Sequence, residues 1–109
     1  MIVNGRELIL RQGFLQALLE LERWVGQQSA SKGRALVKRI MDFACDIVAP
    51  FPLAFPVYYL PAAPARKLRR AVLDRQYALI YEVHEEEIVF VYVYSTYRNP
   101  ASIALSDLE

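Results

Sequence analysis

Residues 68–100 constrain the fold more than any other stretch: LRRAVLDRQYALIYEVHEEEIVFVYVYSTYRNP. The segment is densely apolar and rich in valine, isoleucine and tyrosine, which are the residue types that favour β-strands. Arginines gather at both of its ends, and the acidic run Glu85, Glu86 and Glu87 interrupts its centre. Short connections between such runs join antiparallel neighbours. We therefore predict three consecutive antiparallel strands, with one acidic turn between the last two.

The segment before this meander carries two helical patterns. Between residues 12 and 28, apolar side chains recur at steps of three and four, with further ones beside them: Phe14, Leu18, Leu21 and Val25, widened by Leu15, Leu19 and Trp24. This spacing is typical of an amphipathic helix. A second pattern runs to about Ala49, with Ser29 or Ser31 as its N-cap and a core stripe of Leu36, Ile40, Phe43 and Ile47. The short polar break between the two predicts an antiparallel helical hairpin.

The remaining segments complete an α+β fold. Residues 1–10 predict a short N-terminal strand, and prolines between 50 and 64 predict an irregular crossover from the helices to the meander. The aromatic residues among these prolines are expected to pack along the sheet edge. Pro61 and Pro64 have the spacing of a PxxP ligand, but a crossover inside a small domain is the ordinary use of such a stretch. We predict a single domain spanning residues 1–109, with the meander packed on the helical hairpin.

The composition of the chain indicates the cellular environment in which it works. The chain is 55% hydrophobic, enough to form a core without disulfides or metals, and its net charge of +1 gives no overall attraction to nucleic acid. Cys45 is the single cysteine, the amino terminus does not resemble a signal peptide, and no apolar run approaches the ~20 residues that span a bilayer. These features predict a soluble cytoplasmic protein without membrane association.

Strand pairing divides the predicted β-hairpin of residues 77–94 into two faces. A two-residue turn at Glu85 and Glu86 would pair Glu82 with Val89, and strict alternation then gives an aromatic face of Tyr77, Leu79, Tyr81, Val83, Ile88, Phe90, Tyr92 and Tyr94. The other face is aliphatic and carries Ala78, Ile80, Glu82, Val89, Val91 and Val93. A carboxylate is costly in a sealed core, so Glu82 predicts that its own face is not closed by the helices. The aromatic face is therefore expected to pack on them.

An aliphatic sheet face left open is a surface that a soluble monomer rarely keeps. We expect it to bind a partner protein or a second copy of the chain. The alternative is that residues 101–109 cover it.

The order strand, helical hairpin, proline-broken crossover and meander resembles the RelE/ParE superfamily of toxins from type II bacterial toxin–antitoxin pairs. The resemblance is concentrated in RRAVLDRQYALIYEV and EEIVFVYVYSTYRNP, which look like an arginine-led strand, a strand with Tyr-x-x-x-Tyr and a closing strand that ends in arginine. It implies a toxin that arrests growth, also described as a plasmid stabilisation protein. RelE-like members cleave mRNA in the ribosome, whereas ParE-like members poison DNA gyrase.

Two positions favour the ParE-like branch. Where the cleaving members resemble this chain, an arginine of the middle strand falls at Ala78, which cannot stabilise phosphate charge, and a histidine near the last strand falls at Thr96. Tyr97 and Arg98 remain at that end, and neither alone forms an acid–base pair. The expected function is growth inhibition through DNA gyrase. The alternatives are a ribosome-dependent mRNA endoribonuclease, with Arg70, Tyr97 and Arg98 as catalytic candidates, and a non-toxic binding module.

The resemblance also implies partners. An antitoxin protein would lie across the aliphatic face, at Ala78, Ile80, Glu82, Val89, Val91 and Val93. The target would be contacted by Arg69, Arg70 and Arg98, of which the first two are sent to opposite faces by strand alternation and have Glu82 or Asp74 as alternative ion-pair partners. A homodimer is a further possibility. No cofactor is implied.

Other chemistry-bearing residues are better explained without a site. His84 beside Glu85, Glu86 and Glu87 suggests a metal site, but consecutive turn residues seldom converge on one ion, so no metal is expected. Cys45 has no basic neighbour to activate it and is interpreted as a small core residue. The strand tyrosines suit base stacking, yet their expected position beneath the helices favours core packing.

Overall fold

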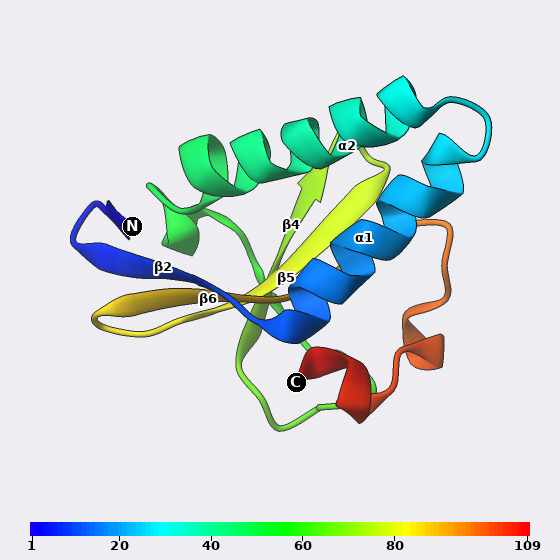
Figure 1. The fold of residues 1–109 in the computed structure, drawn as a ribbon. Coiled ribbons are helices and arrows are strands. Elements are labelled where there is room, and N and C mark those ends of the chain that lie inside the picture. The colour runs from blue at the N-terminus through cyan, green and yellow to red at the C-terminus, as the bar shows by residue number, and fades with distance from the viewer.

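The structure is a computed structural model that describes all residues, 1–109, and it confirms the predicted α+β class (Figure 1). The helices are α1 (Gln12–Gly26) and α2 (Ala30–Asp42), and α2 continues into a π-helical segment, Phe43–Val48. The strands are β1 (Ile2–Val3), β2 (Arg6–Leu10), β3 (Val57–Tyr58), β4 (Leu68–Leu73), β5 (Tyr77–Val83) and β6 (Glu87–Ser95). Short 3-10 turns occupy Pro52–Ala54, Pro100–Ser102 and Leu105–Leu108.

All strands join one six-stranded sheet in the order β1-β2-β6-β5-β4-β3. The predicted meander is present as β4, β5 and β6, each antiparallel to the next, and β2 lies parallel to β6. The sheet has two strands more than the sequence predicts. Asn4 and Gly5, both with positive φ, turn the N-terminal segment into the β1–β2 hairpin, and part of the proline-broken crossover pairs with β4 as β3.

The helical hairpin is confirmed. The Ser29 side chain accepts a hydrogen bond from the backbone N–H of Lys32 and caps α2, as predicted. Gly33 allows the two helices to meet, because a Cβ at this position would lie 2.6 Å from the Glu22 carbonyl oxygen. Leu15, Leu19 and Trp24 do not widen the buried stripe of α1 but are exposed, and Gly13 and Ala17 are buried instead.

The end of α2 departs from the prediction because the helix widens. In the π-helical segment the buried positions are Ala44 and Val48, whereas Ile47 is exposed and Phe43 is half-buried against Phe55. A π-helical turn contains more residues than an α-helical turn, so it rotates each following side chain relative to the expected stripe.

A β-bulge changes the faces of the sheet. Glu82 pairs with Val89 as predicted, but the register shifts between Ile80 and Tyr81, so that Ile80 pairs with Tyr92 and Leu79 with Val93. Tyr81 and Phe90 remain on the helix side, where the Phe90 ring lies 5.6 Å from that of Phe14. Beyond the bulge the side chains of β6 point to the faces opposite to those predicted. Tyr92 and Tyr94 therefore lie with Ile80 and Ala78 on the side of the sheet away from the helices. We call this side the far face.

The expectation that the far face is open is wrong for this structure. Ala78, Ile80 and Val89 on this face are at most 4% exposed, and Val91 and Val93 are buried as well. The C-terminal tail, residues 100–109, and the later part of the crossover lie on the side of the sheet away from α2 (Figure 1), and they contribute Ile103, Leu108, Leu60 and Ala63 to the core. Self-coverage, the alternative explanation, is the arrangement found.

Gly13 seats the tail at the start of α1. Its backbone N–H donates to the Glu109 carbonyl oxygen, and a Cβ on this residue would lie 2.1 Å from the Asp107 carbonyl oxygen. A side chain at position 13 is therefore incompatible with this tail position. Neither α1 nor α2 has the length and apolar character needed for a membrane span.

Candidate functional site

Two arginines and three tyrosines form a connected cluster on the far face, which we call the arginine–tyrosine ladder: Tyr58, Arg70, Tyr94, Tyr92 and Arg98. The guanidinium carbon of Arg70 lies 4.8 Å from the centre of the Tyr58 ring, and Arg70 Nη1 donates to the Tyr94 hydroxyl at 3.4 Å. The Tyr94 and Tyr92 rings are stacked with their centres 6.2 Å apart. At the other end, Arg98 Nη1 donates to the Tyr92 hydroxyl at 2.6 Å.

The sheet places these residues from three strands and one turn. Arg70 pairs with Ile80 and Tyr94 pairs with Ala78, so the contact between Arg70 and Tyr94 crosses β5 diagonally. The small side chain of Ala78 leaves room for that contact. Arg70 thus reaches from β4 over Ala78 to the hydroxyl of Tyr94 on β6.

Arg98 is held in place more firmly than an exposed arginine usually is. Its Nε donates to Ser102 Oγ at 2.9 Å and its Nη2 to the Ser102 carbonyl oxygen at 3.4 Å, in addition to the bond to Tyr92. A guanidinium has five N–H donors, so two remain without a protein acceptor. Neither Arg98 nor Arg70 takes part in a salt bridge. Both are available to an external acceptor.

Two tyrosines of the ladder, Tyr92 and Tyr94, are neutral at physiological pH. Burial, together with the hydrogen bond to Tyr58, raises the pKa of Tyr94 to about 12 even though Arg70 acts in the opposite direction. Burial also raises the pKa of Tyr92, again against the influence of Arg98. A phenol with such a pKa does not accept a proton near pH 7, and arginine remains protonated. The ladder therefore offers hydrogen-bond donors and positive charge, whereas Tyr92 and Tyr94 cannot act as general bases near pH 7.

A second cluster, the Glu82 hub, lies at the other end of the far face. The Glu82 carboxylate forms a salt bridge with Arg66, and Arg11 Nη2 and His84 Nε2 each lie 3.8 Å from its oxygens. The Glu82 side chain is 16% exposed, and the positive charges of Arg66 and Arg11 compensate for its partial burial. Neither Arg69 nor Arg70 is its partner, and Asp74 pairs with Arg39 instead.

Of the other residues singled out from the sequence, Arg69, Tyr97 and Thr96 lie outside both clusters. Strand alternation sends Arg69 and Arg70 to opposite faces, as predicted, and Arg69 Nη1 donates to the Phe55 carbonyl oxygen at 2.5 Å on the helix side. Tyr97 is 90% exposed and lies outside the ladder. Thr96 Oγ1 donates to the Arg75 carbonyl oxygen at 2.7 Å and fixes the turn between β4 and β5. Of the three catalytic candidates, only Arg70 and Arg98 belong to one cluster.

The six residues expected to bind an antitoxin are not presented together. Ala78, Ile80, Glu82 and Val89 lie on the far face, whereas the bulge at Val91 turns Val93 to the helix side, opposite Leu79. Five of the six are buried. A partner that contacts Ala78, Ile80 or Val89 must first displace the tail or the crossover, and Val93 lies on the helix side of the sheet.

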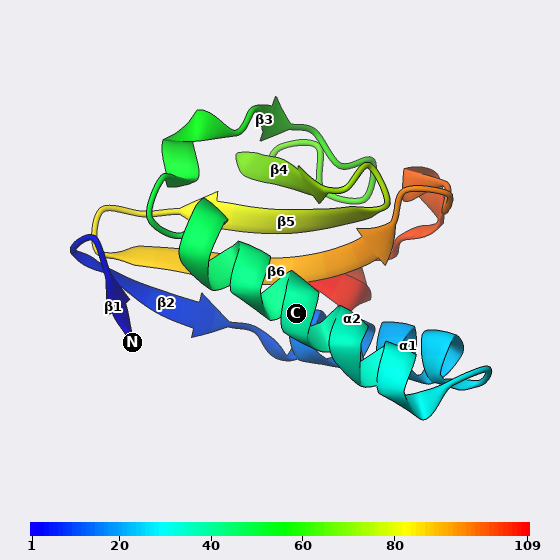
Figure 2. The ribbon, with the colours of Figure 1, turned by 90° about the horizontal axis from the view of Figure 1, so that it is seen from above.

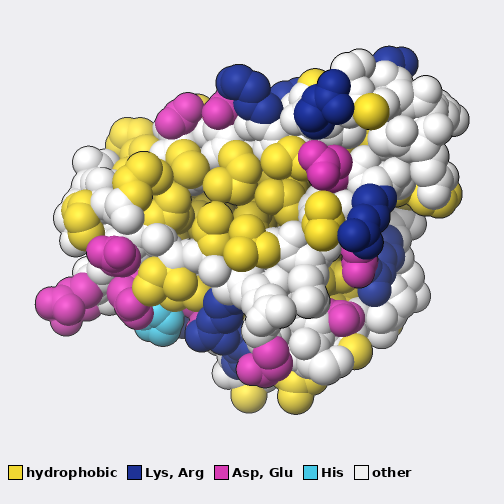
Figure 3. Space-filling model, in the orientation of Figure 1, with side chains coloured by type: hydrophobic (Ala, Val, Ile, Leu, Met, Phe, Trp, Pro, Cys, Tyr) yellow, Lys and Arg dark blue, Asp and Glu magenta, His cyan; other side chains and the backbone are white.

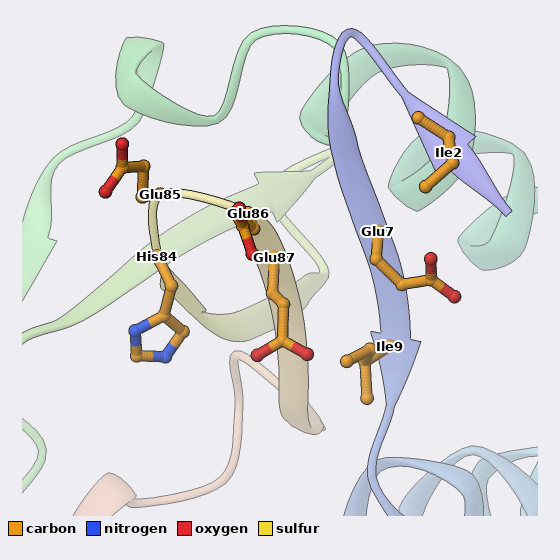
Figure 4. A pocket seen from close by; sticks show the side chains of 7 residues that line it. All are labelled: Ile2, Glu7, Ile9, His84, Glu85, Glu86 and Glu87. Carbon is orange, nitrogen blue, oxygen red and sulfur yellow. The ribbon is translucent and has the colours of Figure 1, made fainter.

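The acidic turn lines a shallow depression at the end of β2 and β6, together with Ile2, Glu7, Ile9 and His84 (Figure 4). Figure 4 shows the carboxylates of Glu7, Glu85 and Glu87 pointing in different directions. No three His, Cys, Asp or Glu side chains in the protein converge as a metal site would require. Cys45 is half-buried, and burial and then Asp46 raise the pKa of its thiol, so it remains a weak nucleophile.

Sequence reasoning missed the roles of Tyr58, Tyr92 and Tyr94 in the ladder and of Arg11 and Arg66 in the hub. The available signal is the Tyr-x-Tyr spacing at 92 and 94 followed by Arg98, which places three polar tips along one strand face. It can be interpreted only when the bulge is known, because strict alternation assigns both tyrosines to the helices. The chain matches no protein-family model and no curated protein.

Proposed function

We propose that this protein is the toxin of a type II toxin–antitoxin pair and that it acts by binding its target through the arginine–tyrosine ladder, with DNA gyrase as the preferred target. The proposal rests on the resemblance of residues 68–100 to the RelE/ParE superfamily and on the order of elements expected of that superfamily: N-terminal strand, helical hairpin, crossover and meander.

The observation that favours binding over cleavage is the absence of a proton acceptor in the ladder. Cleavage of RNA at its 2′-hydroxyl requires a group that removes a proton near neutral pH. The ladder offers two guanidinium groups and phenols whose pKa values are raised by burial. Arg98, positioned by Tyr92 and Ser102, instead resembles the pre-organised arginines that anchor protein interfaces.

One observation favours the alternative, a ribosome-dependent mRNA endoribonuclease. Arg70 restores a cation on the far face beside Ala78, and together with Arg98 it supplies two positive charges that could stabilise a phosphorane. A nuclease of this kind would need its base from the ribosome or from the substrate. This requirement makes it the second choice.

The decisive experiment is controlled expression in bacteria, followed by two assays on the purified protein. We expect growth arrest, inhibition of gyrase supercoiling and intact mRNA in a translating extract. Cleavage of mRNA in that extract with normal supercoiling would replace the first proposal with the second. A folded, well-expressed chain that leaves growth unaffected would contradict both and favour a non-toxic binding module.

Site variants connect the activity to the ladder. Arg70→Ala and Arg98→Ala should each reduce inhibition at least tenfold while the thermal unfolding midpoint changes little, since both side chains retain solvent access. Arg75→Ala is the matched control, because Arg75 is an exposed arginine whose side chain makes no hydrogen bond or salt bridge. An equal loss of inhibition in the control would show that the effect comes from the change in net charge and not from the ladder.

A further inference from the structure

A broad apolar area lies on the helix side of the sheet (Figure 3). Figure 3 shows a broad, continuous hydrophobic area over the diverging ends of α1 and α2 and over β2. Leu15 and Leu19 of α1 are 46% and 44% exposed, and half-buried side chains of α2 and β2 adjoin them. We call this surface the helix-side patch, made up of Leu8, Leu10, Leu15, Leu19, Val37 and Met41.

The patch follows from how the helices pack. They approach closely at their loop end, where Gly33 contacts Glu22 and Gly26, and they spread apart toward the other end (Figure 1). In addition, neither helix extends over β1 and β2 (Figure 2). Leu15, Leu19 and Glu22 lie on successive turns along one side of α1, so the two leucines continue the line that faces α2 where the helices have separated. A soluble monomer rarely keeps such an area uncovered.

Charges beside the patch are complementary under a twofold rotation. The first half of α2 carries basic residues and its continuation carries acidic ones. Arg34 and Asp46 are both exposed, neither takes part in a salt bridge, and Ile40 lies midway between them. Two copies of α2 that cross antiparallel near Ile40 bring Arg34 beside Asp46 of the partner subunit, and the symmetry creates this pair twice.

We propose that the helix-side patch is the interface of a homodimer, in which Leu15, Leu19, Val37 and Met41 of the two copies pack together and Arg34 pairs with Asp46 of the partner subunit. The interface is isologous, because each copy contributes the same surface. It leaves the far face and the arginine–tyrosine ladder outside the contact. The proposal therefore does not depend on the toxin function.

The first test is the mass in solution, by sedimentation equilibrium across a concentration series to about 100 µM. We expect a species of twice the 12.5 kDa chain mass. Leu19→Glu should weaken association about a hundredfold, because each dimer contains the substitution twice in the centre of the patch. Leu105→Glu is the control, since Leu105 is 53% exposed but lies in the C-terminal tail. A monomer throughout, or equal weakening by the control, would overturn the proposal.

The second test does not alter the apolar surface. Arg34→Glu and Asp46→Lys should each weaken the dimer about tenfold by placing like charges together at two symmetric positions. The double variant restores opposite charges and should recover most of the affinity. Because both positions are exposed, these variants retain the fold and decide the question even where Leu19→Glu reduces solubility. A dimer that is indifferent to single reversals, or a double variant as weak as the singles, would refute this arrangement.

Discussion

The two faces of the sheet are covered in different ways. Over β5 and β6 the helix face is covered by the helical hairpin, with a capped second helix and with Phe14, Tyr81 and Phe90 in ring contact. The far face is covered by the crossover and the C-terminal tail, whose regular structure is limited to the two-residue strand β3 and short 3-10 turns. These segments contact the sheet through a few side chains such as Leu60, Ile103 and Leu108. The difference teaches that equal burial does not imply equal resistance to opening, because the tail can leave without disrupting a helix.

The largest effect is expected on the helix face. Phe14→Ala should lower the free energy of unfolding by about 3–5 kcal/mol, since the side chain is fully buried between α1 and the sheet and the helix cannot collapse into the space. Denaturant titration measures it. The adjacent Leu15→Ala, at an exposed position, should cost less than about 1 kcal/mol. Comparable losses would show that the hairpin does not seal this face.

A smaller effect is expected on the far face. Leu108→Ala removes an equally buried side chain but should cost about 2–3 kcal/mol, because the tail can adjust around the space. Hydrogen exchange should show faster opening of residues 100–109 while α1 and α2 keep their protection. The exposed Leu105→Ala is the control. If α1 and α2 lost protection in parallel with the tail, the two covers would form a single cooperative unit and the comparison would fail.

The loss of folding stability at alkaline pH tests one buried tyrosine on each face of the sheet. Burial raises the pKa to about 12 for Tyr81 on the helix face and for Tyr94 on the far face, against 10 in an unfolded chain. The unfolded state therefore releases these protons first, so the stability contributed by each neutral phenol is complete below pH 10 and is lost as pH rises from 10 to 12. The loss is on the order of 2 kcal/mol for each residue.

Tyrosine substitutions separate the two contributions. Stability measured against pH should decline less steeply in Tyr81→Phe and in Tyr94→Phe than in the unaltered protein. Tyr94→Phe retains the ring stack with Tyr92 and loses the long, 3.4 Å hydrogen bond from Arg70. Tyr81→Phe removes the buried 2.6 Å hydrogen bond to the Pro52 carbonyl oxygen and should be less stable at neutral pH. Curves that coincide with that of the unaltered protein would exclude these two phenols as the titrating groups.

The smallest effect is expected at the Glu82 hub. Glu82→Gln leaves Arg66, whose side chain is 26% exposed, without its counter-charge and should cost about 1 kcal/mol at low salt. Asp42→Asn, which removes the exposed partner of Lys38, should cost less than half as much. Both penalties are measured by denaturant titration at two ionic strengths. If Glu82→Gln lowers the free energy of unfolding no more than the exposed control does, the Glu82 hub is as accessible to solvent as an exposed ion pair.

The fold was largely predictable because its signals are local. The three- and four-residue spacing of apolar side chains located α1 and most of α2, Ser29 identified a cap, and the acidic turn set the register from Glu82 to Val89. Two of the errors, at the end of α2 and in the faces of β6, share a physical origin. A π-helical turn after Asp42 and a bulge between Ile80 and Tyr81 each shift the side-chain phase without changing the hydrophobic composition, so periodicity cannot reveal them.

The candidate site was predicted less well for a related reason. Arg70 and Arg98 were recognised as functional candidates from their places at strand ends, but their tyrosine neighbours were assigned to the opposite face. The Glu82 hub draws on segments far apart in the chain: Arg11 before α1, Arg66 in the crossover and His84 in the turn. Such a convergence depends on the parallel pairing of β2 with β6 and on the path of the crossover, neither of which has a local sequence signal.

The two outermost strands of the sheet, β1 and β3, are only two residues long. An edge this short presents few unpaired backbone groups to another polypeptide, and the prolines on either side of β3, Pro56 and Pro61, cannot donate the hydrogen bonds that would lengthen it. Edge-to-edge aggregation is thereby discouraged in a chain with an unusually apolar meander. For the same reason a protein partner gains little by extending the sheet with a strand of its own, and recognition must depend on side chains.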